Sequence, residues 1–385
     1  SVSYEQAGPT VANMASVVPL LLAASGGFLW AFGILGKRLG VEGATNASKP
    51  VRSAITIFVY TSTTVITPLI DLMRIGLDGW ARTWNHPEWR QRIPLIIACG
   101  LISGLGGLLG TLAFAWSAGS SSALVSMIEN GTYTIMSAII IAIYFSEHPK
   151  PQTYLGFALI LLGVVLAQQS SSKRKGSLQD LEEVQTDSDS DGVAAAPISH
   201  TDSDASDSVV APTRFRKRAV VLAVAAGTCW GFGPLGKKIG VDGSGEGHQH
   251  EWATCTYAVY MVSTIFVPLG RVIFSNSESR TEALQNGTFR CLLMGTMLCG
   301  LVSGCGGLVS TYAFAQEGFT GALISTVENG VYTVFGALLI TLVFREKLSC
   351  QQLLSAFLVT LAILVFGLDF QWIFGWTTHV SQSSP

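Results

Sequence analysis

Two glutamates inside apolar segments are the residues whose type and position most directly suggest chemistry. Glu129 belongs to the stretch SMIENGTYT, which begins at Ser126, and Glu328 belongs to STVENGVYT, which begins at Ser325. An ionised carboxylate in hydrocarbon is costly, so a chain keeps one there beside a partner, a water path or a ligand. We interpret the two glutamates as groups that bind a cationic group or exchange protons. The alternative is a structural hydrogen bond to a helix end or to a lysine.

Further polar side chains share a helical face with each glutamate, because residues three and four apart lie on one side of a helix. The two predicted polar stripes consist of Ser122, Ser126, Glu129 and Tyr133 in the first copy, and of Ser325, Glu328 and Tyr332 in the second. Asn130 and Asn329 either join this network or bond to a neighbouring helix. In lipid such stripes must face protein or water, so we expect them to line a central cavity.

Two lysines and two tryptophans form a second set of candidate residues. Lys37 and Lys237 lie at the ends of the first and sixth apolar runs. The simpler interpretation is that their ammonium groups snorkel to water. The alternative is a gate or an anion contact, with a glutamate of the other half as partner. Trp30 and Trp230 lie on the same helical faces and could stack on a sugar or another ring, although packing is the simpler role.

Cysteine and histidine form no pattern typical of a metal site. The seven cysteines are odd in number and contain no CxxC pair, so we expect small apolar residues within helices. His248 and His250 form an HxH in a glycine-rich loop without a nearby cysteine. The sequence therefore predicts no metal and no cofactor.

The composition is typical of a protein embedded in a lipid bilayer. The chain has 385 residues, of which 49% are hydrophobic and 12% charged, and its mean hydropathy is +0.45. The charged share is about half of that in soluble domains. The net charge of -2 and the lack of a basic helix or stacking motif give no indication of a nucleic-acid partner.

Ten apolar runs predict an all-α membrane protein with ten transmembrane helices, because runs of ~18 or more apolar residues are long enough to span a bilayer. In the first half the runs cover about 15–35, 54–73, 93–116, 121–145 and 153–167. In the second half they cover about 219–235, 257–274, 291–315, 320–344 and 353–374. The third and eighth runs are rich in glycine, which predicts close packing between helices.

Three polar segments flank these runs. Residues 1–14 and 375–385 are predicted to be tails, the first of them disordered, and 168–218 a disordered linker rich in serine and acidic residues. Thr186 and Ser188 in the linker precede acidic residues and resemble sites for acidic-directed kinases. A plain solvated spacer is the alternative. The predicted membrane domains are therefore 15–167 and 219–374.

The two halves repeat one sequence pattern. WAFGILGKRLGVEG from Trp30 matches WGFGPLGKKIGVDG from Trp230, and GLISGLGGLLGTLAFA from Gly100 matches GLVSGCGGLVSTYAFA from Gly300, both at an offset of 200. Several blocks in one register predict an internal duplication. Since each half holds five spans, an odd number, the second half enters the membrane from the opposite side. We expect two inverted five-helix repeats with a site between them, an arrangement suited to alternating access.

These motifs resemble the drug/metabolite transporter superfamily, in its EamA-like form with ten helices. The resemblance rests on Trp30 and Lys37 with their counterparts, on the Phe-x-Glu endings at Glu147 and Glu346, and on the glycine-containing fifth helix QTYLGFALILLGVVLA. The second copy of that helix departs by having Ser355 in place of Gly156. The resemblance covers all ten spans and implies a carrier of small organic solutes, without indicating which solute.

The expected function is transmembrane transport of a small organic metabolite, proton-coupled or by exchange. The chain lacks a P-loop GxxxxGK[ST], which argues against an ATP-driven pump, and lacks a paired catalytic constellation within its spans, so we expect no enzyme. The alternative is a cation channel or ion carrier in which the paired glutamates are ion ligands. Lysine and arginine are concentrated on the linker side, which predicts a cytosolic linker and termini outside or in a lumen.

Overall fold

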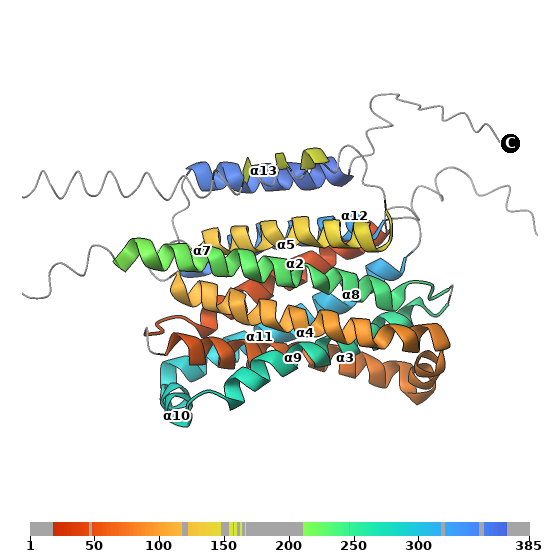
Figure 1. Ribbon diagram of the computed structural model, residues 1–385, viewed down its shortest axis with the longest axis horizontal. Helices are drawn as coiled ribbons and strands as arrows, with labels where there is room; N and C mark the ends of the chain where they lie inside the picture. The colour runs from red at the N-terminus through yellow and green to blue at the C-terminus, as the bar shows by residue number, and fades with distance from the viewer. Residues whose placement is uncertain are drawn as a thin grey trace, which may run out of the picture.

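The computed structural model describes residues 18–45, 48–117, 122–147, 154–156, 158–159, 162–163, 166, 211–245, 247–316, 320–345 and 350–367. Within these residues every regular element is a helix (Figure 1). The first half contains α2 (Val18–Gly40), α3 (Lys49–Asn85), α4 (Pro87–Trp116) and α5 (Ser122–Tyr144). The second half contains α7 (Ala211–Trp230), α8 (Phe232–Val241), α9 (Gln249–Ile273), α10 (Ser277–Gln285), α11 (Gly287–Ala315), α12 (Gly321–Phe344) and α13 (Cys350–Gly367).

Eight helical segments of the described chain are long and apolar enough to cross a membrane, with α7 and α8 counted as one segment, Lys217–Val241. They correspond to the predicted spans 1 to 4 and 6 to 9. The predicted fifth span falls largely outside the described residues, and α13 covers part of the predicted tenth without being one of the eight. The all-α membrane architecture is thus confirmed, whereas the count of ten remains a prediction.

Helix α3 is much longer than the apolar run that predicted it. It is interrupted at Gly76, whose φ of 72° and ψ of 172° are not helical. Glycine adopts such a positive φ readily because it has no Cβ. Beyond this break, Trp80 and Trp84 stack with ring centroids 5.2 Å apart, and Trp84 lies 5.7 Å from Trp89 of α4. We call these three residues the tryptophan cluster.

The counterpart of α2 in the second half is divided into α7 and α8 at Gly231. The physical reason lies at Pro234, which occupies the position of Ile34 in the first half. Proline has no amide hydrogen to donate to the carbonyl of the residue four positions earlier, so the helix is weakened there. Helix α7 begins at Ala211, so the last residues of the predicted linker, 211–218, are helical.

Helices of the two halves pack against each other throughout the bundle. Helix α2 contacts α11 and α12, whereas α7 contacts α4 and α5. Two glycines permit these contacts: a Cβ added at Gly27 would overlap the carbonyl oxygen of Glu328, and one added at Gly227 would overlap that of Glu129. The glutamate-bearing turns of α12 and α5 are therefore held directly against the backbone of α2 and α7.

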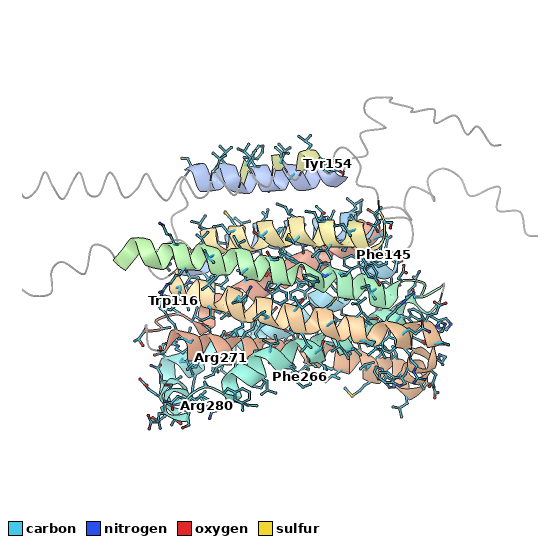
Figure 2. The ribbon with its side chains drawn as sticks, viewed as in Figure 1. Trp116, Phe145, Tyr154, Phe266, Arg271 and Arg280 are labelled. Carbon is cyan, nitrogen blue, oxygen red and sulfur yellow. The ribbon has the colours of Figure 1, made fainter. Side chains whose placement is uncertain are left out.

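The bundle is apolar on its outside and contains many polar groups inside, as expected of a membrane protein. Large apolar side chains such as Met73 and Leu342 are about three-quarters exposed (75% and 73%) and project from the helices, and Figure 2 shows the outward side chains together. Buried threonines such as Thr111 and Thr311 donate to carbonyl oxygens one turn earlier in their own helices. Such internal bonds satisfy hydroxyl groups without water.

Candidate functional site

Two buried ion pairs form the centre of the candidate site. Nζ of Lys37 lies 2.6 Å from Oε1 of Glu129, and Nζ of Lys237 lies 2.8 Å from Oε1 of Glu328. All four side chains are at most 2% exposed. The prediction that the lysines snorkel to water is therefore wrong. The alternative of a glutamate in the other half is also wrong, because each lysine pairs within its own half.

Aromatic rings surround each ammonium group. Nζ of Lys37 lies 5.6 Å from the ring centroid of Phe114 and 5.7 Å from that of Trp230. Nζ of Lys237 lies 5.4 Å from Phe314, and its 5.7 Å contact with Trp30 mirrors the one at Trp230. A cation over a ring face is stabilised by the quadrupole of the ring. Each lysine thus contacts a phenylalanine of its own half and a tryptophan of the other.

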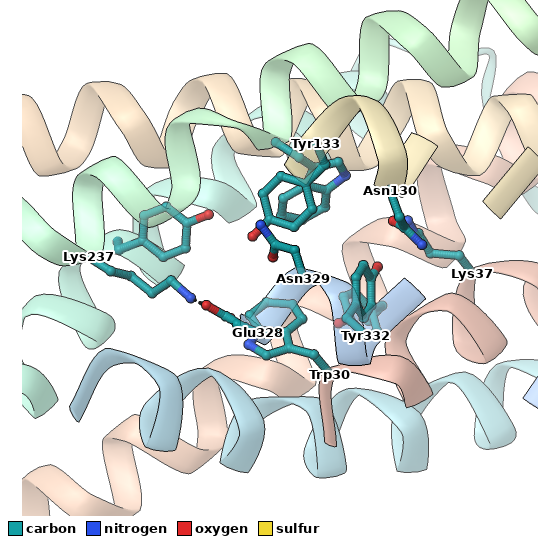
Figure 3. Close-up of a pocket in the computed structure, with 11 residues that line it drawn as sticks. Trp30, Lys37, Asn130, Tyr133, Lys237, Glu328, Asn329 and Tyr332 are labelled. Carbon is teal, nitrogen blue, oxygen red and sulfur yellow. Dashed lines mark hydrogen bonds and ion pairs between the residues drawn. The ribbon is translucent and has the colours of Figure 1, made fainter. Parts of the chain in front are cut away.

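A small cavity lies between the two ion pairs, and Figure 3 shows Lys37 and Lys237 on opposite sides of it. The cavity is lined by Trp30, Lys37, Tyr60, Asn130, Tyr133, Trp230, Lys237, Tyr260, Glu328, Asn329 and Tyr332. Its volume is about 20 Å³, which is room for roughly one water molecule. The rings of Trp30 and Trp230 meet edge to face at 6.4 Å. This conformation therefore encloses the polar groups tightly.

Four of the residues predicted to line the cavity do not line it, and one of them, Ser122, accepts a hydrogen bond of 2.6 Å from Nε of Arg38. Glu129 is not part of the cavity lining, although it forms an ion pair with Lys37, which is part of that lining. Ser126 accepts a hydrogen bond of 3.1 Å from Asn130 one turn later in α5. Ser325 donates a hydrogen bond of 2.8 Å to Ser137 and so joins α12 to α5. The other nine residues predicted for the site lie around the cavity.

Sequence reasoning missed two tyrosines that line the cavity. Tyr60 comes from α3 and Tyr260 from α9, and both are completely enclosed, with 2% exposure. Glycines of neighbouring helices make room for them, since a Cβ added at Gly233 would lie 2.6 Å from the Tyr260 hydroxyl. The signal that could have identified them is the matching Val-Tyr pair at the same offset of 200 as the other repeated blocks.

Several buried polar atoms beside the ion pairs have no hydrogen-bond partner within the described chain. Among them are Nε1 of Trp30 and Trp230, Oε2 of Glu129 and Glu328, and Oδ1 of Asn329. A buried polar atom without a partner costs free energy, so such atoms need an explanation at a site of this kind. Four of these atoms, the donors of Trp30 and Trp230 and the acceptors of Glu328 and Asn329, belong to residues that line the cavity, so they are available to a molecule that offers both kinds of hydrogen-bonding group.

The two ion pairs differ at one position of the repeat. Ser310 accepts a hydrogen bond of 2.7 Å from Nζ of Lys237, in addition to the ion pair. Its counterpart is Gly110, where an added Cβ would lie 2.5 Å from Oε1 of Glu129. Glu129 therefore occupies the space that a serine side chain would need. The second pair gains a hydroxyl that the first pair excludes.

We expect Ser310→Ala to lower the free energy of unfolding by about 1.5–3 kcal/mol, the usual contribution of a hydrogen bond to a charged group. Thermal unfolding of the purified protein in one detergent measures the change. The matched control is Ser53→Ala, because the Ser53 hydroxyl is equally buried but has no hydrogen-bond partner among the described residues. A loss as large in the control would show that the effect does not come from the bond to Lys237.

The other motif residues lie away from the cavity. Glu147 accepts hydrogen bonds of 3.0 and 3.2 Å from the amides of Gly321 and Ala322, which caps the start of α12. A carboxylate there is stabilised by the helix dipole. Glu346 lies outside the described residues. His248 and His250 contact carboxylates instead of each other, at 3.4 Å and 3.2 Å respectively.

Neither a protein-family model nor a curated protein matches this chain. Among solved structures, one described only as a crystal structure of a protein is 13% identical to this chain. The alignment covers 90% of this chain and 96% of the other, with a TM-score of 0.49. That likeness carries no argument about function. The class of protein is defined by its own helices, as an integral membrane protein with several membrane-crossing segments around a polar cavity.

Proposed function

We propose that this protein is a carrier that moves a small organic metabolite across a membrane by alternating access, on an EamA-like scaffold of two inverted five-helix repeats. The observation that carries the proposal is the presence of two matching Lys–Glu ion pairs whose lysines line one enclosed cavity from opposite sides. Intramembrane ionisable residues are rare and mark transport pathways. A site at the interface of two repeats is the arrangement that many secondary transporters use.

The contacts between halves support the inverted-repeat part of the proposal. The first-half helix α2 lies against α11 and α12, and the second-half helix α7 lies against the corresponding α4 and α5. Each tryptophan likewise contacts the lysine of the other half, since Trp230 contacts Lys37 and Trp30 contacts Lys237. Relations of this kind are expected when two homologous units face each other across a pseudo-two-fold axis.

A cation channel or cation carrier is less consistent with these ion pairs. One oxygen of each glutamate is already bound to an ammonium group at 2.6–2.8 Å. A metal or other small cation would have to displace that ammonium group or share the carboxylate with it. Two lysines and two glutamates also leave the site without net charge, whereas a cation site gains affinity from excess negative charge.

The test is a thermal-shift screen of the purified protein in detergent, against sugars, nucleotide sugars, amino acids, amines and phosphorylated metabolites. A solute that binds only the folded state raises its stability, by about 2.7 kcal/mol at a concentration of 100 Kd. We expect one solute class to stabilise the protein, and Glu328→Gln to abolish the shift. Glu278→Gln, at an exposed position of α10, is the matched control and should keep it.

The solute identified in this screen is then tested for transport into proteoliposomes. Saturable uptake that is stimulated by unlabelled solute on the far side supports a carrier. Single-channel currents carried by cations, together with the absence of any stabilising organic solute, would instead support the channel and overturn the proposal.

A further inference from the structure

A polar hollow lies at the end of the bundle where α8 ends and α9 begins, which we call the α8–α9 end. Its volume is about 310 Å³, within the range of sites for small organic molecules. The side chains that matter for the argument are Lys238, Asp242, Ser244, Gln249, Phe314 and Gln316. The Lys238 ammonium lies 3.7 Å from the Asp242 carboxylate, and the Gln316 amide donates to that of Gln249 at 3.1 Å.

One aromatic ring, that of Phe314, lies between this hollow and the central cavity. Phe314 lines the hollow, and its ring centroid lies 5.4 Å from Nζ of Lys237, which lines the cavity. The side chain is almost completely buried, at 1% exposure. A molecule that passes between the hollow and the cavity would therefore have to displace this ring.

The opposite end of the bundle, where α2 ends and α3 begins, differs at the matching sequence positions. Trp116 stands there in place of Gln316, and Lys49 in place of Gln249. Nζ of Lys49 lies 4.8 Å from the Trp116 ring, and the guanidinium carbon of Arg218 lies 5.5 Å from it. Figure 2 labels Trp116 at this end. An indole between two cations thus occupies the place that a small amide takes at the hollow.

We infer that the hollow is an outer binding site through which the solute reaches the central cavity, with Phe314 as the ring that must move. The inference rests on the proposed function. Asp242 pairs with both Lys238 and Arg92 at 3.7 Å, and Arg92 also lies 3.9 Å from Glu88, so the four side chains together carry no net charge. The two amides and the Ser244 hydroxyl offer both donors and acceptors. The site therefore suits a small molecule without net charge, uncharged or zwitterionic, that carries several hydrogen-bonding groups.

Cysteine labelling tests this route without knowledge of the solute. Asn329→Cys places a thiol in the central cavity, and Asn130→Cys does so at the matching position in case the first variant fails to fold. The purified protein is treated with a small methanethiosulfonate reagent, and peptide mass spectrometry follows the label at that position alone. We expect slow but complete labelling of the folded protein.

The decisive variant is Gln316→Trp, which reproduces at the hollow the residue found at the other end. We expect it to slow labelling of the cavity thiol about tenfold or more, since the blocked path would open only in a minor conformation. Gln316→Phe serves if the tryptophan variant does not fold. The matched control, Trp116→Gln, should not slow labelling. Unchanged labelling in Gln316→Trp, or no labelling of either folded cysteine variant, would overturn the route.

The charge of the reagent tests the solute class. Cationic and anionic methanethiosulfonates of similar size are compared at Ser244→Cys, inside the hollow. A hollow without net charge should give the same ratio of rates as a free thiol. A passage lined by one sign of charge raises the rate for the opposite sign about tenfold or more, and that outcome would overturn the assignment to molecules without net charge.

These results are separable from those for the proposed function. If labelling depends on Gln316 but no solute stabilises the protein and cations carry single-channel currents, the route stands and the carrier proposal fails. If a solute is found and carried but labelling ignores Gln316→Trp, the carrier stands and the hollow is not its route.

Discussion

Lys237→Met should destabilise the protein by about 3–5 kcal/mol, because it leaves the Glu328 carboxylate buried without a partner charge. The carboxylate is only 2% exposed and cannot turn to water without moving α12. Lys37→Met should have a similar effect through Glu129. Thermal unfolding in one detergent gives the change, and Arg90→Met, at an exposed position, is the matched control.

The double variant Lys237→Met with Glu328→Gln separates the loss of the interaction from the burial of a single charge. We expect it to recover most of the stability, because replacing a buried ion pair by neutral groups is often close to neutral. A double-mutant cycle then gives the coupling between the two side chains. Additive losses would contradict the direct pairing of Lys237 and Glu328.

Gly27→Ala should destabilise the protein by about 1–3 kcal/mol, the usual cost of inserting one carbon into a packed interface. The added Cβ would overlap the carbonyl oxygen of Glu328, so α2 or α12 must move. Gly227→Ala should act in the same way on α5, through the carbonyl oxygen of Glu129. Since both contacts position a glutamate, solute binding should weaken together with stability.

The control for this prediction is Gly270→Ala in α9, where an added Cβ would have no atom of the described chain within 4 Å. There the substitution should stabilise the helix by about 0.5–1 kcal/mol, because alanine has less backbone freedom to lose than glycine. Thermal unfolding compares all three variants. A gain at Gly27→Ala equal to that at Gly270→Ala would mean that α2 and α12 do not pack as closely as the structure shows.

Local patterns predicted the membrane-crossing helices and most of the residues around the cavity. Apolar runs long enough to span a bilayer are recognisable without tertiary information, and an acidic residue such as Glu328 stands out inside one. For each such residue, the internal repeat of the sequence also predicted the corresponding residue in the other half. These features depend on sequence positions that lie close together or at a constant offset, so they could be identified in advance.

The partners of the lysines could not be identified in this way. Lys37 ends an apolar run, which favours a snorkelling side chain, but α2 continues to Gly40 and keeps the lysine inside the bundle. Its partner Glu129 lies 92 positions further along the chain. Pairing over such a distance depends on how helices pack, and no local pattern records it. The predicted end of the run at the first charge was therefore too early.

The tryptophan cluster has a consequence for how the protein sits in its membrane. Trp80, Trp84 and Trp89 gather at the α8–α9 end, where Trp89 also packs with Trp252 of α9. Trp84 is 39% exposed and can reach the headgroup level of a bilayer, where tryptophans anchor helices, whereas Trp89 is buried and supports it from within the bundle. At the opposite end α10 contains no aromatic residue, and the tryptophan there, Trp116, lies between Lys49 and Arg218 instead of in a cluster of indoles. We therefore expect the first end to keep a constant depth and the other to absorb differences in bilayer thickness, which holds the mouth of the hollow at a fixed distance from the lipid headgroups.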